Sequence, residues 1–486
     1  MHIDLPERSQ FVDGRWRPTG GNGIGVTDPS TEDTFFTVAR GSAEDVDSAV
    51  TAARKATAGW AATSASERGQ TLGRWARLIE DNADSLAALE ARDVGKPLWG
   101  GSMNIAIATS IVHYFAGAAD KLTGVTLPTR SPDFHGYTLL EPLGVCAVIT
   151  PWNVPAVLTA ANVAPALAAG NTVVLKPSEE APRVVLALAA LASAAGLPDG
   201  VFNVVTGLAE TGAALTSHPG IDHISFVGST ATGRAVMRAA AETLVPVKLE
   251  LGGKSPNIVF ADADLDEAIP EIVRSITENA GQNCYAGSRL IVASSIADAV
   301  RERVVASMRA VKIGSWDTNP DMGPLVNRAQ YEKVRGFLDG APGDGGRILT
   351  GGGRPTSVGD TGFFVEPTVV DNVDASSRIV REEVFGPVLA IQTFSTDAAA
   401  LEIANSTDFG LLACIWTSDV SRALHMAASV RAGQVSINQF ADSGVIGFPF
   451  NMQKDSGFSR GGGYLAMREY SHEKGVAAKL RSTVHP

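Results

Sequence analysis

The chain has 486 residues, of which 45% are hydrophobic and 19% are charged, and its formal net charge is −12 at pH 7. A chain of this length exceeds what one hydrophobic core usually serves, so we expect two or three domains in an ordinary globular protein. The negative charge argues against a nucleic-acid-binding surface and against docking on anionic lipid, because both need clustered lysine and arginine.

The first clear pattern predicts an amphipathic helix over residues 66–97. Apolar residues recur there at spacings of three, four and seven, and Gly95 followed by Pro97 supplies a stop signal. From residue 145 onward, short apolar runs alternate with helical stretches. We expect strands over 145–150, 172–177, 201–207, 223–229 and 245–253, and a helix over 183–195. Buried strands that alternate with helices are typical of a parallel sheet covered on both faces.

A second α/β pattern begins near Pro256 and carries Cys284. The glycine-rich residues 340–355 predict a surface loop or a hairpin. Residues 475–483 predict a short edge strand, whose partner the pattern does not identify.

The three cysteines, Cys146, Cys284 and Cys414, are far apart, and none has the spacing of a zinc motif. A sparse, odd number of cysteines fits a reducing compartment better than a disulfide framework. The first residues lack the features of a secretory signal, and prolines and asparagines interrupt the longest apolar stretch, 143–175. We therefore expect a cytoplasmic protein without a membrane span or a bound metal.

Cys284 lies in ENAGQNCYAGS, residues 278–288. A free cysteine is usually a small buried hydrophobe, and it is a nucleophile only where the site favours its thiolate. Two stretches at predicted strand ends bear on this choice. In TPWNVP, residues 150–155, Asn153 either caps the backbone or donates to a developing oxyanion. In LKPSE, residues 175–179, Lys176 is either a surface charge or part of a ligand site at the sheet edge.

Two further stretches complete the set. In FVGSTATG, residues 226–233, a strand leads through Gly228 and Ser229 into a helix whose first backbone donors suit a phosphate. In KLELGGKSP, residues 248–256, Glu250 lies between apolar residues. A carboxylate in an apolar strand needs a partner or a raised pKa, which leaves a general base or a structural ion pair as its role.

Together with GQNC and EEVFGPV, these stretches stand in the order and approximate spacing of the aldehyde dehydrogenase superfamily, which the chain resembles from about residue 10 to about residue 480. The resemblance implies an α/β fold with a Rossmann-like cofactor domain, an α/β catalytic domain and a small β oligomerisation hairpin. It places the NAD-binding domain at 1–120 and 143–252, the catalytic domain at 253–455, and the oligomerisation segment at 121–142 and 456–486.

The resemblance also implies roles. Cys284 matches the nucleophile that forms a thiohemiacetal and then a thioester, Glu250 the base that activates water, and Asn153 the oxyanion donor. The implied NAD contacts are Ile149, Thr150, Pro151, Trp152, Lys176, Ser178, Glu179, Gly207, Gly228, Ser229, Leu251, Glu383 and Phe385. The implied substrate channel contains Val154, Leu158, Ala161, Tyr285 and Phe450.

Three departures from the family pattern stand out. Ala209 replaces a glycine in the loop after VVTG, residues 449–452 read PFNM where the family has a PFGG-type stretch, and residues 459–461 read SRG where it has Gly-Arg-Glu. The missing acid puts in question the hydrogen-bond network that it serves.

The leading prediction is the NAD-dependent oxidation of an aldehyde to an acid by a homodimer or homotetramer. Glu179 favours NAD, because the 2′-phosphate of NADP would meet a like charge, although use of NADP stays open. The small Ala161 indicates room for a medium or bulky apolar aldehyde, including an aromatic one. The alternatives are a CoA-acylating semialdehyde dehydrogenase, a catalytically silent family member with a structural role, and a thiol hydrolase with a Cys–His pair.

Overall fold

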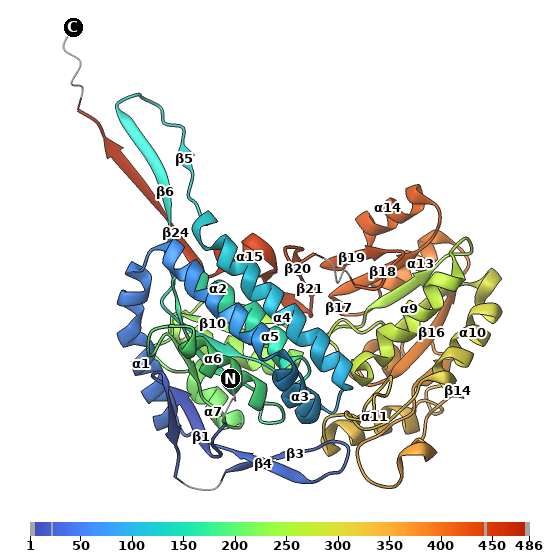
Figure 1. Ribbon diagram of the computed structural model, residues 1–486. Coiled ribbons are helices and arrows are strands. Elements are labelled where there is room, and N and C mark those ends of the chain that lie inside the picture. Colours follow the sequence, from blue (N-terminus) through green and yellow to red (C-terminus); the bar gives the residue numbers. More distant parts are fainter. Residues whose placement is uncertain (1–4, 21–22, 442–444, 482–486) are drawn as a thin grey trace.

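The computed structural model describes residues 5–20, 23–441 and 445–481. Figure 1 shows two α/β lobes side by side, the first in blue and green and the second in yellow and orange, with a slender group of strands projecting from the first. Within the described residues, no helix has the length and apolar character needed to cross a membrane.

The first lobe contains an eight-stranded sheet in the order β2-β1-β9-β8-β7-β10-β11-β22. Its centre, from β9 to β11, is parallel as the sequence predicts, whereas β1, β2 and β22 join it antiparallel. The strands are β1 (Ser9–Val12), β2 (Arg15–Pro18), β7 (Val145–Ile149), β8 (Thr172–Lys176), β9 (Phe202–Val204), β10 (His223–Val227), β11 (Val247–Glu250) and β22 (Gly457–Phe458).

Helices cover both faces of this sheet. Strand β7 shows why, because Cys146 and Val148 pack into one core and the alternating Val145 and Ala147 into another. The first core is shared with α2 (Ala65–Asp81), α3 (Ala83–Val94), α4 (Leu98–Ala118), α5 (Pro155–Ala168), α6 (Arg183–Ala194) and α15 (Gly463–Glu469). The second core is shared with α1 (Ala43–Ala62), α7 (Ala209–Thr216) and α8 (Thr230–Thr243).

The single helix predicted over 66–97 is wrong in one respect, because α2 and α3 are separate helices that meet at Asn82. The Asn82 backbone leaves the helical region at φ −116°, ψ 16°, and its side-chain amide donates to Leu78 O at 2.7 Å. Gly95, at φ 83°, ends α3 as predicted, since glycine adopts this left-handed conformation without strain.

The second lobe contains a seven-stranded sheet in the order β14-β15-β16-β13-β12-β18-β19. Its strands are β12 (Pro256–Val259), β13 (Arg289–Ala293), β14 (Arg347–Thr350), β15 (Thr368–Asp371), β16 (Val388–Phe394), β18 (Leu412–Trp416) and β19 (Gln434–Ile437). Its helices are α9 (Leu265–Thr277), α10 (Ala297–Ala310), α11 (Arg328–Gly340), α12 (Arg378–Arg381), α13 (Asp397–Asn405) and α14 (Val420–Ser429). Residues 340–355 form no hairpin of their own, because β14 pairs with β15 further along the chain.

The projecting strands form a sheet in the order β24-β6-β5. Strand β24 (Ser471–Lys479) pairs antiparallel with β6 (Phe134–Pro142) along its whole length, and β5 (Thr126–Leu127) pairs with the other side of β6. The predicted edge strand therefore exists and its partner is β6, while residues 482 and 483 lie outside the described part. Short pairs complete the fold, namely β3 (Ile24–Thr27) with β4 (Thr34–Val38), β17 (Phe409–Gly410) with β21 (Gln453–Lys454), and β20 (Phe450–Asn451) with β23 (Arg460–Gly461).

Candidate active site

The sequence motifs of the first lobe meet at one edge of its sheet. Ile149 at the end of β7 lies beside Lys176 at the end of β8, and Val227 at the end of β10 lies beside Glu250 at the end of β11. The carboxyl ends of parallel strands share one edge, which is where open α/β sheets bind ligands. The candidate residues of the first lobe therefore lie together at the carboxyl ends of its parallel strands, as the sequence analysis predicts.

The loop that carries Cys284 comes from the second lobe and has an unusual backbone. Asn279, Ala280 and Gly281 have φ angles of 51°, 54° and 70°, so three consecutive residues are left-handed. Such strain persists only where surrounding contacts hold it. Here the Asn279 side chain donates to Asn153 O at 3.0 Å, and a Cβ on Gly281 would lie 2.2 Å from Gly386 O.

This loop brings Cys284 onto the end of β11. The thiol donates to Glu250 Oε1 at 3.0 Å, and the Glu250 side chain is buried. The approach is close enough that a Cβ on Gly253 would lie 2.2 Å from Cys284 O, which explains the glycine pair after Glu250. Sequence reasoning therefore identified two residues, 34 positions apart, whose reactive atoms are in contact.

The pKa of the Cys284 thiol differs from the expectation that the site favours a thiolate. Burial raises the pKa of the Cys284 thiol well above its ordinary value, and the charges of Glu250 and Glu383 raise it further. Burial also raises the pKa of Glu250, which the hydrogen bond from the thiol and the charge of Lys248 partly offset. Burial thus favours the neutral forms of both groups, and the thiol proton points along the hydrogen bond to Glu250.

Asn153 is held by a buried charged network that the sequence analysis missed. Its carbonyl accepts from Lys96 Nζ at 2.7 Å, and the same Nζ lies 2.8 Å from Glu90 Oε1. Glu90 also accepts from Asn104 Nδ2 at 2.6 Å and from the backbone N–H of Ala156 at 3.0 Å. The side-chain Oδ1 of Asn153 is buried and has no hydrogen-bond partner among the described residues.

The part of the sheet edge that carries Lys176, Glu179 and Ser229 suits the binding of a dinucleotide. The buried Lys176 Nζ donates to Pro177 O at 2.8 Å and lies 3.8 Å from the half-exposed Glu179, while Ser178 caps the next turn. These groups can hold the hydroxyls of a ribose. Ser229 is the N-cap of α8, where it accepts from Thr232 N at 3.3 Å, and the helix start suits a pyrophosphate.

Two glycines beside these residues occupy positions where a side chain has no room. A Cβ on Gly207 would lie 2.1 Å from Thr211 Oγ1, and one on Gly228 would lie 2.6 Å from the Phe226 ring. The Gly228 N–H donates to the Glu250 carbonyl at 3.0 Å, which connects the segment before α8 to the end of β11. The polar groups of Lys176, Glu179 and Ser229, together with the backbone at Gly207 and Gly228, therefore fit NAD.

Other residues at this edge, among them Trp152 and Gly253, contact Glu383 and Phe385 of the second lobe. Glu383 Oε1 accepts from Gly253 N at 3.0 Å, and the Phe385 ring lies edge-on to Trp152 at 5.4 Å between centroids. Thr150 Oγ1 is buried and has no partner among the described residues, although its N–H donates to Lys176 O at 3.2 Å. Ile149 and Pro151 flank Thr150, and Leu251 is buried after Glu250. Of these predicted contacts, Glu383 lies close enough to Cys284 for its charge to raise the pKa of the thiol.

Cys284 and Glu250 lie in the wall of a cavity of about 320 Å³ that all five predicted channel residues line. The rest of the wall is largely apolar, and no described residue of the wall is a histidine. The thiol therefore has a carboxylate rather than an imidazole as its partner. Sequence reasoning missed several wall residues, namely Met103, Ile107, Ile111, Tyr114, Phe115, Arg274, Glu278, Phe440, Val445, Ile446 and Phe448.

Two of the three departures from the family pattern, in residues 449–452 and 459–461, lie at the same cavity. Met452, Ser459 and Gly461 line it, and Ser459 Oγ lies 3.2 Å from the Met452 sulfur. A Cβ on Gly461 would lie 2.5 Å from Phe450 O, so a larger residue needs a shift of the backbone there. Ala209 is the first residue of α7.

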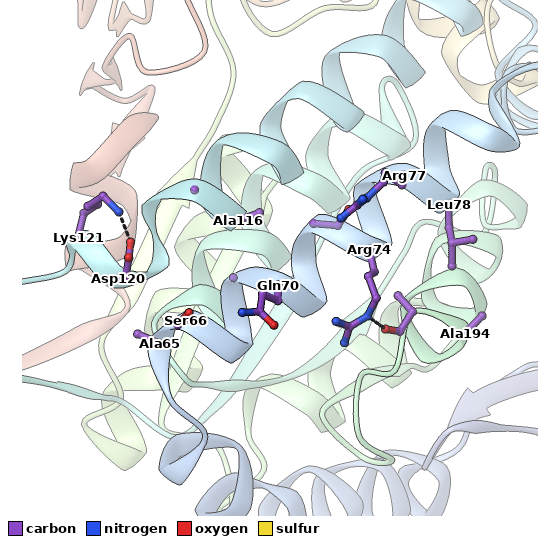
Figure 2. Close-up of a pocket in the computed structure, with 14 residues that line it drawn as sticks. Ala65, Ser66, Gln70, Arg74, Arg77, Leu78, Ala116, Asp120, Lys121 and Ala194 are labelled. Carbon is purple, nitrogen blue, oxygen red and sulfur yellow. Dashed lines mark hydrogen bonds and ion pairs between the residues drawn. The ribbon is translucent and has the colours of Figure 1, made fainter.

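A larger surface cavity, of about 870 Å³, lies along α2 near the end of α4. Figure 2 shows that its charged side chains include Arg74, which bonds to the Ala195 carbonyl, and Lys121, which pairs with Asp120. Its remaining wall consists largely of small residues, and none of the described residues that line it is a cysteine, histidine or glutamate. The smaller cavity is therefore the one equipped for chemistry.

Comparison with known proteins agrees with this geometry. The model of the aldehyde dehydrogenase family matches residues 16–476. Hydroxyisobutyraldehyde dehydrogenase of Mycolicibacterium austroafricanum is 41% identical, over 97% of this chain and 93% of the relative. A point mutant of aldehyde dehydrogenase from Bacillus cereus has a TM-score of 0.95 at 38% identity, covering 98% of this chain and 97% of that one.

A point mutant of betaine aldehyde dehydrogenase from Staphylococcus aureus, solved in complex with NAD⁺, also has a TM-score of 0.95, at 34% identity over 98% of both chains. The sequence motifs, the fold and these matches over nearly the whole length agree, and the chain therefore belongs to the aldehyde dehydrogenase family.

Proposed function

We propose that the protein oxidises an aldehyde to the carboxylic acid with NAD⁺, through a covalent intermediate on Cys284. The observation that carries this proposal is the 3.0 Å contact between the Cys284 thiol and Glu250 Oε1 at an apolar cavity. A nucleophile bonded to its base is the arrangement that covalent catalysis needs.

In the first stage, Glu250 takes the thiol proton and the sulfur attacks the aldehyde carbon. The resulting oxyanion is stabilised by the Asn153 side-chain amide and the backbone N–H of Cys284. A positioned donor of this kind contributes about 3 kcal/mol. The buried contacts of Lys96 and Asn279 to the Asn153 carbonyl fix the backbone from which the amide extends.

NAD⁺, when bound, supplies the acceptor for the hydride that leaves the aldehyde carbon. Lys176 and Glu179 hold the adenosine ribose, Ser229 and the start of α8 hold the pyrophosphate, and Glu383 and Phe385 contact the nicotinamide riboside. Glu179 favours NAD over NADP, because a 2′-phosphate would meet its carboxylate.

Before the second stage, Glu250 releases the thiol proton to solvent. It then deprotonates a water molecule, which hydrolyses the Cys284 thioester and releases the acid, and the thiolate that leaves takes this proton back from Glu250. A water-activating base is unnecessary when coenzyme A takes the acyl group, so the buried Glu250 favours hydrolysis over the CoA-acylating alternative. The intact Cys284–Glu250 contact likewise favours catalysis over a silent structural role.

The substrate that the cavity favours is an uncharged apolar aldehyde, including an aromatic one. Val154, Leu158, Ala161 and Phe450 form an apolar wall. Two cations line the described wall, and both have partners within the chain. Lys248 Nζ donates to Asn162 Oδ1 at 3.0 Å. Arg274 bonds to Glu278 at 2.9 Å and to Glu271 at 2.6 Å. Because these carboxylates neutralise the guanidinium, it is poorly suited to clamping a carboxylated substrate.

The test is NADH formation with aliphatic, aromatic, cationic and carboxylated aldehydes, with and without coenzyme A. We expect the highest kcat/KM for an apolar aldehyde and no requirement for coenzyme A. Dependence on coenzyme A would support the acylating alternative, and no NADH with any aldehyde would support the silent one. A preference for a carboxylated aldehyde would refute the substrate class.

We also propose that residues 1–120 and 143–252 form the NAD-binding domain, that 253–455 form the catalytic domain, and that 121–142 with 456–486 mediate a homodimer or homotetramer. Exposed Leu127, Phe134 and Leu139 on the projecting strands support the assembly role, because such apolar surface favours association. A monomeric mass in light scattering at micromolar concentration would contradict it. We place the protein in the cytoplasm, on the strength of its three unpaired cysteines, and cell fractionation tests this location.

A further inference from the structure

A buried lysine lies next to the candidate base. Lys248 and Glu250 are two positions apart on β11, so their side chains extend from the same face of the sheet. Both side chains are buried and both line the cavity that contains Cys284. A lysine is almost never fully buried without a compensating partner, so its presence there needs a reason.

The surroundings of Lys248 suit an ammonium group. Its Nζ donates to Asn162 Oδ1 at 3.0 Å, and the same oxygen accepts from Ser225 Oγ at 2.9 Å. The Asn162 amide nitrogen donates to Leu158 O at 2.8 Å, which fixes the oxygen toward the lysine. The Tyr470 ring lies 5.7 Å from Nζ and presents a favourable face to a cation.

Charged and titratable groups reach this lysine from several elements. Burial lowers the pKa of Lys248, whereas the charge of Glu469 on α15 and that of Glu250 raise it. On β10, burial lowers the pKa of His223 to about 3, so this imidazole is neutral and adds no competing charge at neutral pH. The Tyr470 hydroxyl and the Cys146 thiol, both with pKa values raised by burial, are neutral as well. Arg274 and Glu278 face the cavity as an ion pair.

We propose that Lys248 is a positioning residue whose buried positive charge keeps Glu250 ionised near neutral pH, so that the carboxylate can accept the proton of the thiol and later of water. The proposal rests on the role proposed for Glu250. The thiol proton moves to the Glu250 carboxylate and then to solvent, the water proton moves to the same carboxylate and then to the Cys284 thiolate, and Lys248 keeps its own protons throughout.

The test is the pH dependence of kcat/KM for an accepted aldehyde at saturating NAD⁺, compared between wild type and Lys248→Met. On the acid limb of the profile, kcat/KM falls as Glu250 becomes protonated. Loss of the Lys248 charge should raise the midpoint of this fall by about one pH unit, as expected for removal of a charge near a carboxylate. At a pH on that limb, kcat/KM falls about tenfold, while the alkaline plateau is retained within about threefold.

Two further variants make the result decisive. Asn162→Asp keeps the lysine but places a carboxylate against it, so it should move the acid limb in the same direction, and it decides the question should Lys248→Met fail to fold. Lys454→Met is the control, because Lys454 Nζ donates to the Asn405 and Thr407 carbonyls and does not line the cavity that contains Glu250. We expect no shift for this control.

An unchanged acid limb in folded Lys248→Met or Asn162→Asp would overturn the proposal, as would a uniform loss of rate at every pH. These outcomes differ from failure of the proposed function, in which the wild-type protein itself oxidises no aldehyde.

Discussion

The buried Lys96–Glu90 pair offers a sharp test of how the fold holds Asn153. The side chains of Lys96 and Glu90 are 2% and 0% exposed, and their charged atoms are 2.8 Å apart. Lys96→Met leaves the Glu90 carboxylate buried with only neutral donors from Asn104 and Ala156. Removing one partner of a buried pair costs about 3–5 kcal/mol of folding free energy. It also removes the Lys96 bond to the Asn153 carbonyl, and a shift of about 1 Å at an oxyanion donor lowers kcat about 10²-fold.

The assay combines urea unfolding at a fixed protein concentration with kcat for an accepted aldehyde. The double variant Lys96→Met/Glu90→Gln carries no uncompensated charge, so it should recover about 2 kcal/mol of stability relative to Lys96→Met. Its kcat should stay low, because the Asn153 carbonyl still lacks the Lys96 donor and keeps only the bond from Asn279. Strictly additive effects on stability, or a wild-type kcat in Lys96→Met, would refute this reasoning.

Glu179→Gln should lower the ratio of kcat/KM with NAD to kcat/KM with NADP. In the wild type, repulsion between Glu179 and the 2′-phosphate of NADP costs about 1–3 kcal/mol, which corresponds to about 5- to 150-fold in kcat/KM. Equal or better use of NADP by the wild type would contradict this prediction. Glu250→Gln should lower kcat by about 10²–10⁴-fold through loss of the base, and a kcat within threefold of wild type would exclude that role. His223→Leu should weaken the pH dependence of stability. Burial lowers the pKa of His223 to about 3, so the unfolded chain binds the extra proton and stability is lost as pH falls below about 6.5 toward 3. Between pH 7.5 and 5, urea titrations should show the variant losing about 2 kcal/mol less than wild type, and identical losses would refute the assignment.

The sequence carried enough information for the sheet edge and the reactive pair. The strands that end at Ile149, Lys176 and Glu250 are short, buried and apolar, and such runs are readable without a structure. The roles of Cys284 and Glu250 came from resemblance, since no local pattern links residues so far apart. Cys146 and Cys414 are buried, as their apolar runs indicate.

Other features were hidden for physical reasons. The apolar spacing passes from Ile79 to Leu86 without interruption, so the break between two helices at Asn82 leaves no trace in the periodicity. Glu90 resembles an ordinary helix charge, although its position four residues after Leu86 puts it on the apolar face, and that signal could have revealed the buried pair.

The ionisation of the thiol was hidden as well. It depends on how closely the Glu250 and Glu383 carboxylates approach Cys284, and only the folded chain fixes that approach.

The central claim is that Cys284 is the nucleophile, and the most direct measurement is the rate of NADH formation by Cys284→Ser with an accepted aldehyde. A serine hydroxyl is far less acidic than a thiol, while its size suits the same position beside Glu250. We predict that the variant folds with an unchanged circular dichroism spectrum and loses essentially all activity. Retention of more than a few per cent of the wild-type kcat would show that the reaction does not proceed through Cys284.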